Sequence, residues 1–170
     1  MIEEHDHEYR VGFGSDIHPL VKDRKLMLGG LYIESALGLD GHSDADVVLH
    51  SLVDALLGAA AMGDIGTYFP DTEPKFKNAD SKAFLFAVRN MLLEKRWEIV
   101  NIDIVITAAT PRLEGYKPQI KRCISSLLGI DFEAVNIKAK TNNGFGPEGE
   151  GAAISAQTAV LIKRKYKRTL

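Results

Sequence analysis

The sequence predicts an α/β protein of the α+β kind, with a single mixed β-sheet covered by helices. Apolar residues alternate as in strands in some segments and recur at helical spacing in others, in the order β-β-α-α-β-α-β-β, which mixes hairpins with crossovers. The chain has 170 residues, of which 45% are hydrophobic and 26% charged, enough for one well-buried core. We therefore expect one domain over residues 10–165, between a disordered tail at 1–9 and a basic tail at 166–170.

Composition limits the partners and the compartment. The formal charge of -2 and the pI near 6.2 lack the basic character that nucleic-acid binding usually requires. No apolar run approaches the roughly 18 residues of a membrane span, and the acidic start does not resemble a targeting peptide. The single cysteine, Cys123, indicates a reducing compartment. We expect a cytoplasmic protein, or a trimmed form in an organelle stroma, with neither nucleic acid nor membrane as partner.

Two strands are expected before the first helix. The pattern RVGFGSDIH begins a strand at Arg10, and because residues two apart point the same way, Asp16 and His18 share a face. Pro19 ends the pairing of this strand. The segment KLMLGGLYI is expected to be its hairpin partner, and the loop ESALGLDG then leads to His42.

The first helix is expected to start at a capping box formed by Ser43 and Asp46 and to stop near Gly63. Its apolar face is broad, and on one flank Asp46, His50 and Asp54 recur every four residues. Two carboxylates that bracket an imidazole could orient it for metal binding or proton transfer. The alternative is an ordinary solvated flank.

The second half of the chain is read from turn and cap signals. Residues 62–84 are rich in Gly, Pro, Asp and Thr and predict a long functional loop, whose end holds Asp80 and Ser81 as a helix cap. The elements that follow are a helix to Lys95, a strand over 99–106, a helix from Pro118 to Leu128 ended by Gly129, a strand at VNIKAKT, a glycine-rich loop and a final strand over 152–165.

The candidate chemistry lies in Asp16, His18 and His50. Two imidazoles and one carboxylate are a ligand set that zinc takes in open catalytic sites, with a fourth position for water or substrate. The same ligands accept manganese or cobalt. The D-x-H spacing is weak alone, and an ordinary hydrogen-bonded histidine is the alternative. The signal is the coincidence of D-I-H at a strand end, H-S-D-x-D at a helix start and G-D-I-G after that helix.

Several of these motifs together resemble one family. SDIH, GHSDADVVLHSLVDALLGAAAMGDIGTYFPDT, ADS, ATPRL and VNIKAKT resemble the 2-C-methyl-D-erythritol 2,4-cyclodiphosphate synthases, from Arg10 to about Lys163. The resemblance implies a homotrimer with active sites between subunits. It also implies a phosphorus-oxygen lyase of non-mevalonate isoprenoid synthesis (the MEP pathway), which converts 4-diphosphocytidyl-2-C-methyl-D-erythritol 2-phosphate to the cyclic diphosphate and CMP.

The resemblance also assigns roles by position. Asp16, His18 and His50 would bind Zn²⁺ next to the substrate, and His42 and Ser43 would contact the diphosphate, with His42 and Thr141 stabilising the transition state. We expect His42 just before a helix N-terminus, which favours phosphate. The methylerythritol part would be held by Asp64, Ile65, Gly66, Phe69, Pro70, Asp71, Thr72 and Glu73. Cytidine would be read by Ala108, Ala109, Thr110, Pro111, Arg112, Leu113, Glu114, Lys140, Thr141, Asn142 and Asn143.

The chain departs from the family pattern after the strand VNIKAKT. The family's T-T-T-E is Lys140 to Asn143 here, and the loop to Phe145 is two residues shorter. Asn143 therefore stands where an acid contacts a second cation, Mg²⁺ or Mn²⁺, that bridges the diphosphate, so we expect weaker magnesium affinity with partial compensation by Lys140. Glu148 replaces an arginine that would bind an anionic isoprenoid at the trimer axis. Phe145 would line that cavity or simply pack.

Two other functions remain open from the sequence. A metal-dependent phosphohydrolase of a nucleoside diphosphate derivative would use the same ligands, with water as the nucleophile. A non-catalytic metal-binding or scaffold protein would have no use for the loop from Ala108 to Glu114.

Overall fold

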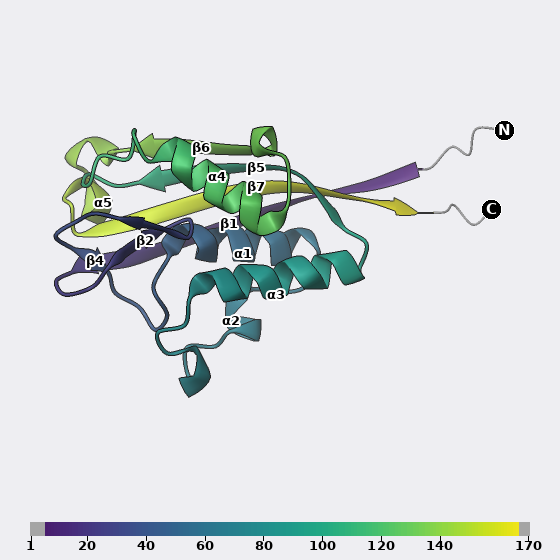
Figure 1. The fold of residues 1–170 in the computed structure, drawn as a ribbon, viewed down its shortest axis with the longest axis horizontal. Coiled ribbons are helices and arrows are strands. Elements are labelled where there is room, and N and C mark those ends of the chain that lie inside the picture. Colours follow the sequence, from purple (N-terminus) through teal and green to yellow (C-terminus); the bar gives the residue numbers. More distant parts are fainter. Residues whose placement is uncertain (1–5, 167–170) are drawn as a thin grey trace.

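A five-stranded mixed sheet forms the centre of the protein (Figure 1). The computed structural model describes residues 6–166. The strand order is β4 (Gly38–Leu39), β1 (Asp6–Val21), β7 (Ala153–Tyr166), β5 (Glu98–Thr107) and β6 (Val135–Lys140). Only β5 and β6 run parallel; the other neighbours are antiparallel. The predicted class, a mixed sheet flanked by helices, is therefore confirmed.

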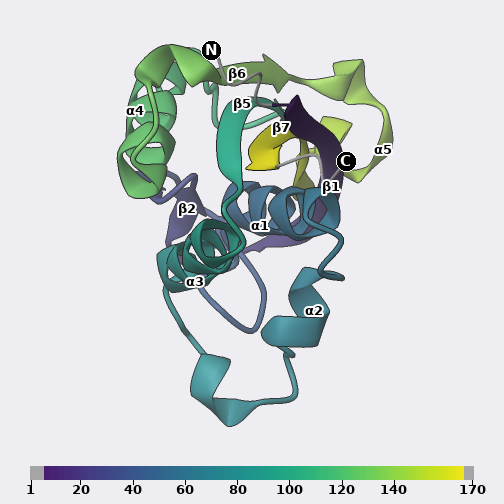
Figure 2. The ribbon, with the colours of Figure 1, turned by 90° about the vertical axis from the view of Figure 1, so that its right-hand side faces the viewer.

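Three long helices gather on one side of this sheet (Figure 2). They are α1 (Val47–Ala59), α3 (Ser81–Glu94) and α4 (Lys117–Leu128). Helix α1 lies between the sheet and α3, which explains why it is buried nearly all round, with Leu49, Leu52 and Leu56 fully inaccessible. Among the described residues, no helix is long and apolar enough to cross a bilayer.

Local signals placed several elements correctly. Asp80 caps α3 by accepting from the Lys82 amide, as predicted. Pro118 lies in the first turn of α4, and Gly129 ends that helix in the left-handed conformation. The predicted strands at 99–106 and 152–165 correspond to β5 and β7, and VNIKAK is β6.

The predicted hairpin between the first two strands is wrong. Gly29 and Gly30 both have positive φ, 64° and 78°, and reverse the chain between β2 (Leu26–Leu28) and β3 (Leu31–Ile33). These strands pair with each other in a separate two-stranded sheet, while β1 pairs with β7. The expectation of a single sheet is corrected accordingly.

The boundaries of the predicted tails also change. Residues 6–9 belong to β1, where Tyr9 pairs with Lys163, and Tyr166 belongs to β7. Arg10 and Arg164 both bind Glu8 and lie over the Trp97 ring, which stabilises this end of the strand pair. The remaining parts of the two predicted tails, 1–5 and 167–170, lie outside the described residues.

The first helix begins three residues later than predicted. Asp46, and not Ser43, is its N-cap, and the Asp46 carboxylate accepts from the amides of Val48 and Leu49. Ala45 has a φ of 57°, which no α-helix admits, so the helix cannot start before it. The helix also ends at Ala59, ahead of the predicted stop at Gly63.

The predicted loop at 62–84 contains short helical turns. They are α2 (Ile65–Tyr68) and the 3₁₀ turn η1 (Pro74–Phe76), and α3 begins inside the same stretch. Two further 3₁₀ turns, η2 (Phe132–Ala134) and η3 (Asn142–Gly144), and the short helix α5 (Gly146–Gly149) complete the chain.

Two glycines in β1 allow α1 to lie directly on the strand. A Cβ atom at Gly12 would be 1.9 Å from the Ala55 carbonyl oxygen, and one at Gly14 would be 2.1 Å from that of Ser51. The obstacle is helix backbone in both cases, so no larger residue fits without moving α1. This close approach brings His50 on α1 next to Asp16 and His18 on β1.

Candidate active site

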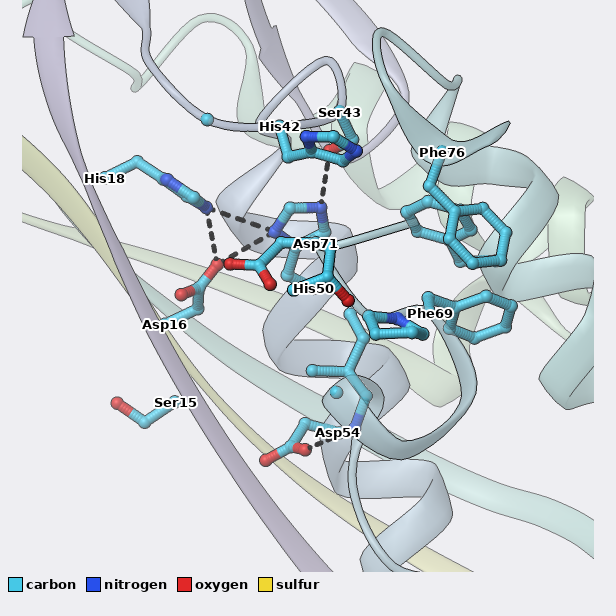
Figure 3. A pocket seen from close by; sticks show the side chains of 16 residues that line it. Ser15, Asp16, His18, His42, Ser43, His50, Asp54, Phe69, Asp71 and Phe76 are labelled. Carbon is cyan, nitrogen blue, oxygen red and sulfur yellow. Dashed lines mark hydrogen bonds and ion pairs between the residues drawn. The ribbon is translucent and has the colours of Figure 1, made fainter. Parts of the chain in front are cut away.

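Asp16, His18 and His50 converge as predicted (Figure 3). Asp16 Oδ2 lies 3.0 Å from His18 Nε2 and 2.9 Å from His50 Nδ1, and the two ring nitrogens are 3.2 Å apart. In a tetrahedral zinc site with ligands at about 2.0–2.1 Å, the ligand atoms are about 3.3 Å from one another. The three side chains therefore fit a divalent metal ion with one coordination position open.

The charges of this cluster are set by its own members. Burial on its own raises the pKa of Asp16, but hydrogen bonds from His18 and His50 outweigh it and lower that pKa to about 2. Burial likewise lowers the pKa of His18, but the Asp16 carboxylate reverses the effect and leaves it raised. Asp16 is therefore ionised at neutral pH and supplies the negative ligand.

The outward face of the His50 ring is fixed by hydrogen bonds. The backbone of Asp40 contributes to the raised pKa of His18. His50 Nε2 lies 3.1 Å from Ser43 Oγ and 2.9 Å from Ser81 Oγ. Metal-binding histidines are commonly oriented through their second ring nitrogen in this way.

The predicted flank of Asp46, His50 and Asp54 does not act as one unit. Asp46 is fully buried and binds the amides of Gly29 and Gly30, so the carboxylate beside His50 is Asp16. Asp54 accepts from the Ile65 amide at 3.1 Å and so holds the start of α2 against α1. Only His50 and Asp54 of the three face the candidate site.

A cavity of about 560 Å³ adjoins Asp16, His18 and His50. Figure 3 shows Asp16, His18 and His50 at one side of it and Phe69 and Phe76 at the other. The predicted residues among those that line it are Asp16, His18, His42, Ser43, His50, Ile65, Gly66, Phe69, Pro70, Asp71 and Thr72. Segments distant in sequence thus form one polar-and-apolar pocket of the size of a small-molecule site.

Two of the residues predicted for this pocket, Asp64 and Glu73, make other contacts in the structure. Asp64 is the N-cap of α2 and accepts from the amide and hydroxyl of Thr67. Glu73 contributes its carbonyl oxygen, 3.1 Å from His42 Nε2, which therefore donates to it. The side chains of Asp64 and Glu73 do not line the cavity.

The placement of His42 before a helix N-terminus is wrong. Four residues separate His42 from the first residue of α1, and the amides of Val48 and Leu49 at the start of that helix are already bound by Asp46. Any contact of His42 with a phosphate would come from its own imidazole and not from the helix end.

Sequence reasoning missed an aromatic wall and a buried serine. Phe69 and Phe84 stack with centroids 4.5 Å apart, and Phe76 meets both rings edge-on at 5.6 Å. Phe84 was not predicted for the site, and Ser81 was predicted only as a helix cap. Their positions depend on how α3 packs on α1, which no local pattern specifies.

The predicted cytidine residues form a second cluster. The Ala108 amide donates to the Lys140 carbonyl at 2.8 Å, which joins the segment 108–114 to 140–143 beyond the ends of β5 and β6. Asn142 and Asn143 have φ of 59° and 50° and make a tight exposed turn, followed by Phe145, which is 78% exposed. Neither segment contributes to the cavity lining, and Phe145 is exposed on the surface of its own chain.

The sequence profile of the YgbB family matches residues 9–163. The chain belongs to the YgbB family. It is 48% identical over 155 residues to the 2-C-methyl-D-erythritol 2,4-cyclodiphosphate synthase of Neisseria gonorrhoeae, covering 91% of this chain and 97% of that one. It is 49% identical over 156 residues to the synthase of Clostridium novyi, covering 92% and 99%.

Solved structures of similar proteins share the YgbB fold. The structure described as "IspF (Plasmodium falciparum) CDP complex" has a TM-score of 0.81 and 34% identity, and 93% of this chain matches 97% of it. The bifunctional IspDF of Campylobacter jejuni has a TM-score of 0.90 and 38% identity, but the match spans only 43% of that longer chain. The three candidate metal ligands and the residues that line the pocket lie within the part of the chain that the YgbB profile matches.

Proposed function

We propose that this chain converts 4-diphosphocytidyl-2-C-methyl-D-erythritol 2-phosphate to 2-C-methyl-D-erythritol 2,4-cyclodiphosphate with release of CMP. The observation that carries the proposal is the convergence of Asp16, His18 and His50 at the edge of a 560 Å³ cavity. Membership of the YgbB family supports it, since relatives with nearly half their residues identical carry that synthase activity in their names.

Asp16, His18 and His50 would hold Zn²⁺, or manganese or cobalt, which accept the same donors. Such an ion supplies Lewis-acid polarisation of a phosphoryl oxygen at its open position. The protein's part is to present three preorganised ligands, one of which, His50, is already held by hydrogen bonds on its far side.

The other pocket residues bind and orient the substrate. An oxygen of the 2-phosphate attacks the β-phosphorus, and the bond from that phosphorus to the bridging oxygen breaks. CMP then leaves with that oxygen and its electron pair. His42 and Ser43, at the cavity wall, would contact the diphosphate, and the segment from Ile65 to Thr72 would enclose the methylerythritol part. Asp64 and Glu73 would contribute through their backbone.

The cytidine half of the site would come from a second copy of the chain in a homotrimer. Ala108 to Glu114 and Lys140 to Asn143, with Thr141 as transition-state stabiliser, do not line the cavity of their own chain. The face of the sheet that points away from the helices carries Val11, Phe13 and Ile17, whose exposed fractions are 74%, 63% and 49%. Apolar side chains on an uncovered sheet face favour a protein interface. Sedimentation equilibrium of the purified chain tests this, with a monomeric mass as the contradicting result.

Product analysis tests the proposed reaction. The enzyme with Zn²⁺ and Mg²⁺ should yield CMP and a cyclic diphosphate, in which ³¹P NMR shows two phosphorus nuclei coupled through one bridging oxygen. A linear phosphate ester would instead support the phosphohydrolase, and an unchanged substrate the non-catalytic protein.

Zinc affinity should fall as the pH is lowered. A metal ion binds only the neutral imidazole, so protons compete below the pKa of His18, which lies above its ordinary value of 6.5 because of Asp16. Competition therefore begins at a higher pH than for an isolated histidine, and affinity falls by about tenfold per pH unit for each proton displaced. Asp16 stays ionised down to about pH 2 and adds nothing in this range. Competition titrations with a chromophoric chelator measure this, and a pH-independent affinity between about pH 8 and about pH 5 would contradict it.

The Asn143→Glu variant should need several-fold less magnesium for half-maximal activity than the wild type. A carboxylate at this exposed turn adds a charged oxygen for the Mg²⁺ or Mn²⁺ that would bridge the substrate diphosphate. The matched control is Asn142→Glu, which adds the same charge one residue away. Equal half-saturation in the wild type and Asn143→Glu would show that position 143 does not contact the second cation.

A further inference from the structure

Two buried hydroxyl groups contact the side of the His50 ring that points away from Asp16 and His18. Ser81, the first residue of α3, is fully buried, and its Oγ lies 2.9 Å from His50 Nε2. Ser43 is 5% exposed, and its Oγ lies 3.1 Å from the same nitrogen. Ser81 has so far been described only as a contact of this nitrogen, and Asp44 has no assigned role.

The direction of these hydrogen bonds follows from counting protons. Ser81 Oγ lies 2.5 Å from Asp44 Oδ1, and the same carboxylate accepts from the amides of Ser81 and Asp46. A carboxylate only accepts, so the single hydroxyl proton of Ser81 is donated to Asp44. Ser81 then presents a lone pair to His50, and Nε2 of His50 must carry the proton.

Ser43 does not change this result. If Ser43 donated to His50 Nε2, that nitrogen would present a lone pair to the Ser81 oxygen at only 2.9 Å, and two acceptors at hydrogen-bond distance repel. Ser43 accepts from the Ala45 amide at 3.1 Å and can direct its own proton to Ser81 Oγ, 3.4 Å away.

We propose that Ser81 and Asp44 are positioning residues, which keep a proton on His50 Nε2, so that Nδ1 is the nitrogen that gives up its hydrogen bond to Asp16 and binds the metal ion. In a neutral imidazole one nitrogen carries the proton and the other the lone pair, so protonation at Nε2 frees Nδ1 for a metal ion. The relay joins the loop before α1, helix α1 and the start of α3. The docking of α3 on α1 thereby determines whether the third metal ligand is available. This inference rests on the metal centre of the proposed function.

The test compares Ser81→Ala with Ser51→Ala in the full-length protein. Ser51 is the matched control because it is also fully buried and follows His50 directly in α1, yet it binds the Val48 carbonyl and Thr158 instead. Zinc affinity by chelator competition should fall about 10- to 100-fold in Ser81→Ala, the range for losing an outer contact of a ligand, and should change less than threefold in Ser51→Ala.

A second readout needs no metal. Long-range ¹⁵N–¹H spectra of histidine-labelled, metal-free protein in mildly alkaline buffer report the tautomer, with His50→Gln to assign the signals. The spectra are taken in an Asp16→Ala background, because the Asp16 carboxylate otherwise competes for a proton on His50 Nδ1. In this background, the chain without a further change and Ser51→Ala should show His50 as Nε2–H, and Ser81→Ala should lose this preference.

The two readouts separate the inference from the proposed function. Wild-type protein that binds no zinc would overturn the metal centre, while the tautomer still tests the relay. An Nδ1–H tautomer in the Asp16→Ala background, or equal zinc affinity in Ser81→Ala and Ser51→Ala, would overturn the relay while leaving the metal centre in place.

Discussion

Replacement of His18 by alanine should remove zinc binding and activity together and leave the fold nearly intact. The imidazole is one of three converging ligands, and the two that remain cannot make a closed set for a tetrahedral ion. Activity should fall by more than the roughly 100-fold that loss of an outer contact costs. The His18 ring lies outside the hydrophobic core, beside the cavity, so its loss leaves core packing unchanged.

Zinc content by mass spectrometry, turnover and thermal unfolding measure this outcome. His7→Ala is the control. It removes the same kind of side chain from the same strand, but His7 pairs with Lys165 and does not line the cavity. Full activity of His18→Ala would contradict the proposed metal centre. Unfolding of the variant would show that the ion is structural and not catalytic.

The Gly14→Ala substitution should weaken both the fold and the site. The new Cβ would lie 2.1 Å from the Ser51 carbonyl oxygen and 2.6 Å from the Ala55 amide nitrogen, both backbone atoms of α1. Neither can rotate aside, so α1 must move away from β1, and we expect a loss of at least the 1–3 kcal/mol, roughly, that overpacking a core costs. Because His50 precedes Ser51 in α1, the same shift separates it from Asp16 and His18, and zinc affinity should fall with stability.

Urea unfolding and zinc titration of the purified variant test this expectation. Gly58→Ala is the matched control, since it adds a methyl group to α1 at an exposed position where the nearest atom is the Phe13 carbonyl oxygen at 4.0 Å. Alanine within a helix is favoured over glycine by roughly 0.5–1 kcal/mol, so this variant should be as stable as the wild type or more so. A Gly14→Ala protein with wild-type stability and zinc affinity would show that α1 does not need this close approach.

Elements with strong local signals could be predicted from the sequence, and elements defined by distant partners could not. Asp80 caps the start of α3 and Gly129 ends α4, and β5 alternates between buried and less buried residues from Asn101 to Thr107. The start of α1 was misplaced because Asp46 is held by the amides of Gly29 and Gly30, a contact between segments far apart in the chain. A capping motif in the local sequence does not reveal such a distant contact.

The residues of the candidate site also fall into those that the sequence predicts and those that it does not. Asp16 and His18 could be paired because strand geometry places alternate residues on one face, and His50 followed from the combination of motifs. Phe76, Phe84 and Ser81 reach the site only through the packing of α3 and η1, so no periodicity in the sequence marks them. The wrong assignment of Asp46 has the same origin, since its four-residue spacing from His50 is real but its carboxylate is turned inward.

The place of β7 in the sheet bears on how the chain matures. β7 lies between β1 and β5, so Gly12, near the start of the chain, pairs with Val160, near its end. Such non-local pairing gives a high contact order, which slows folding because a long loop must close before the contact is gained. A nascent chain on the ribosome therefore cannot fix the strand that carries Asp16 and His18 until β7 has emerged. Metal loading should therefore follow the pairing of β1 with β7.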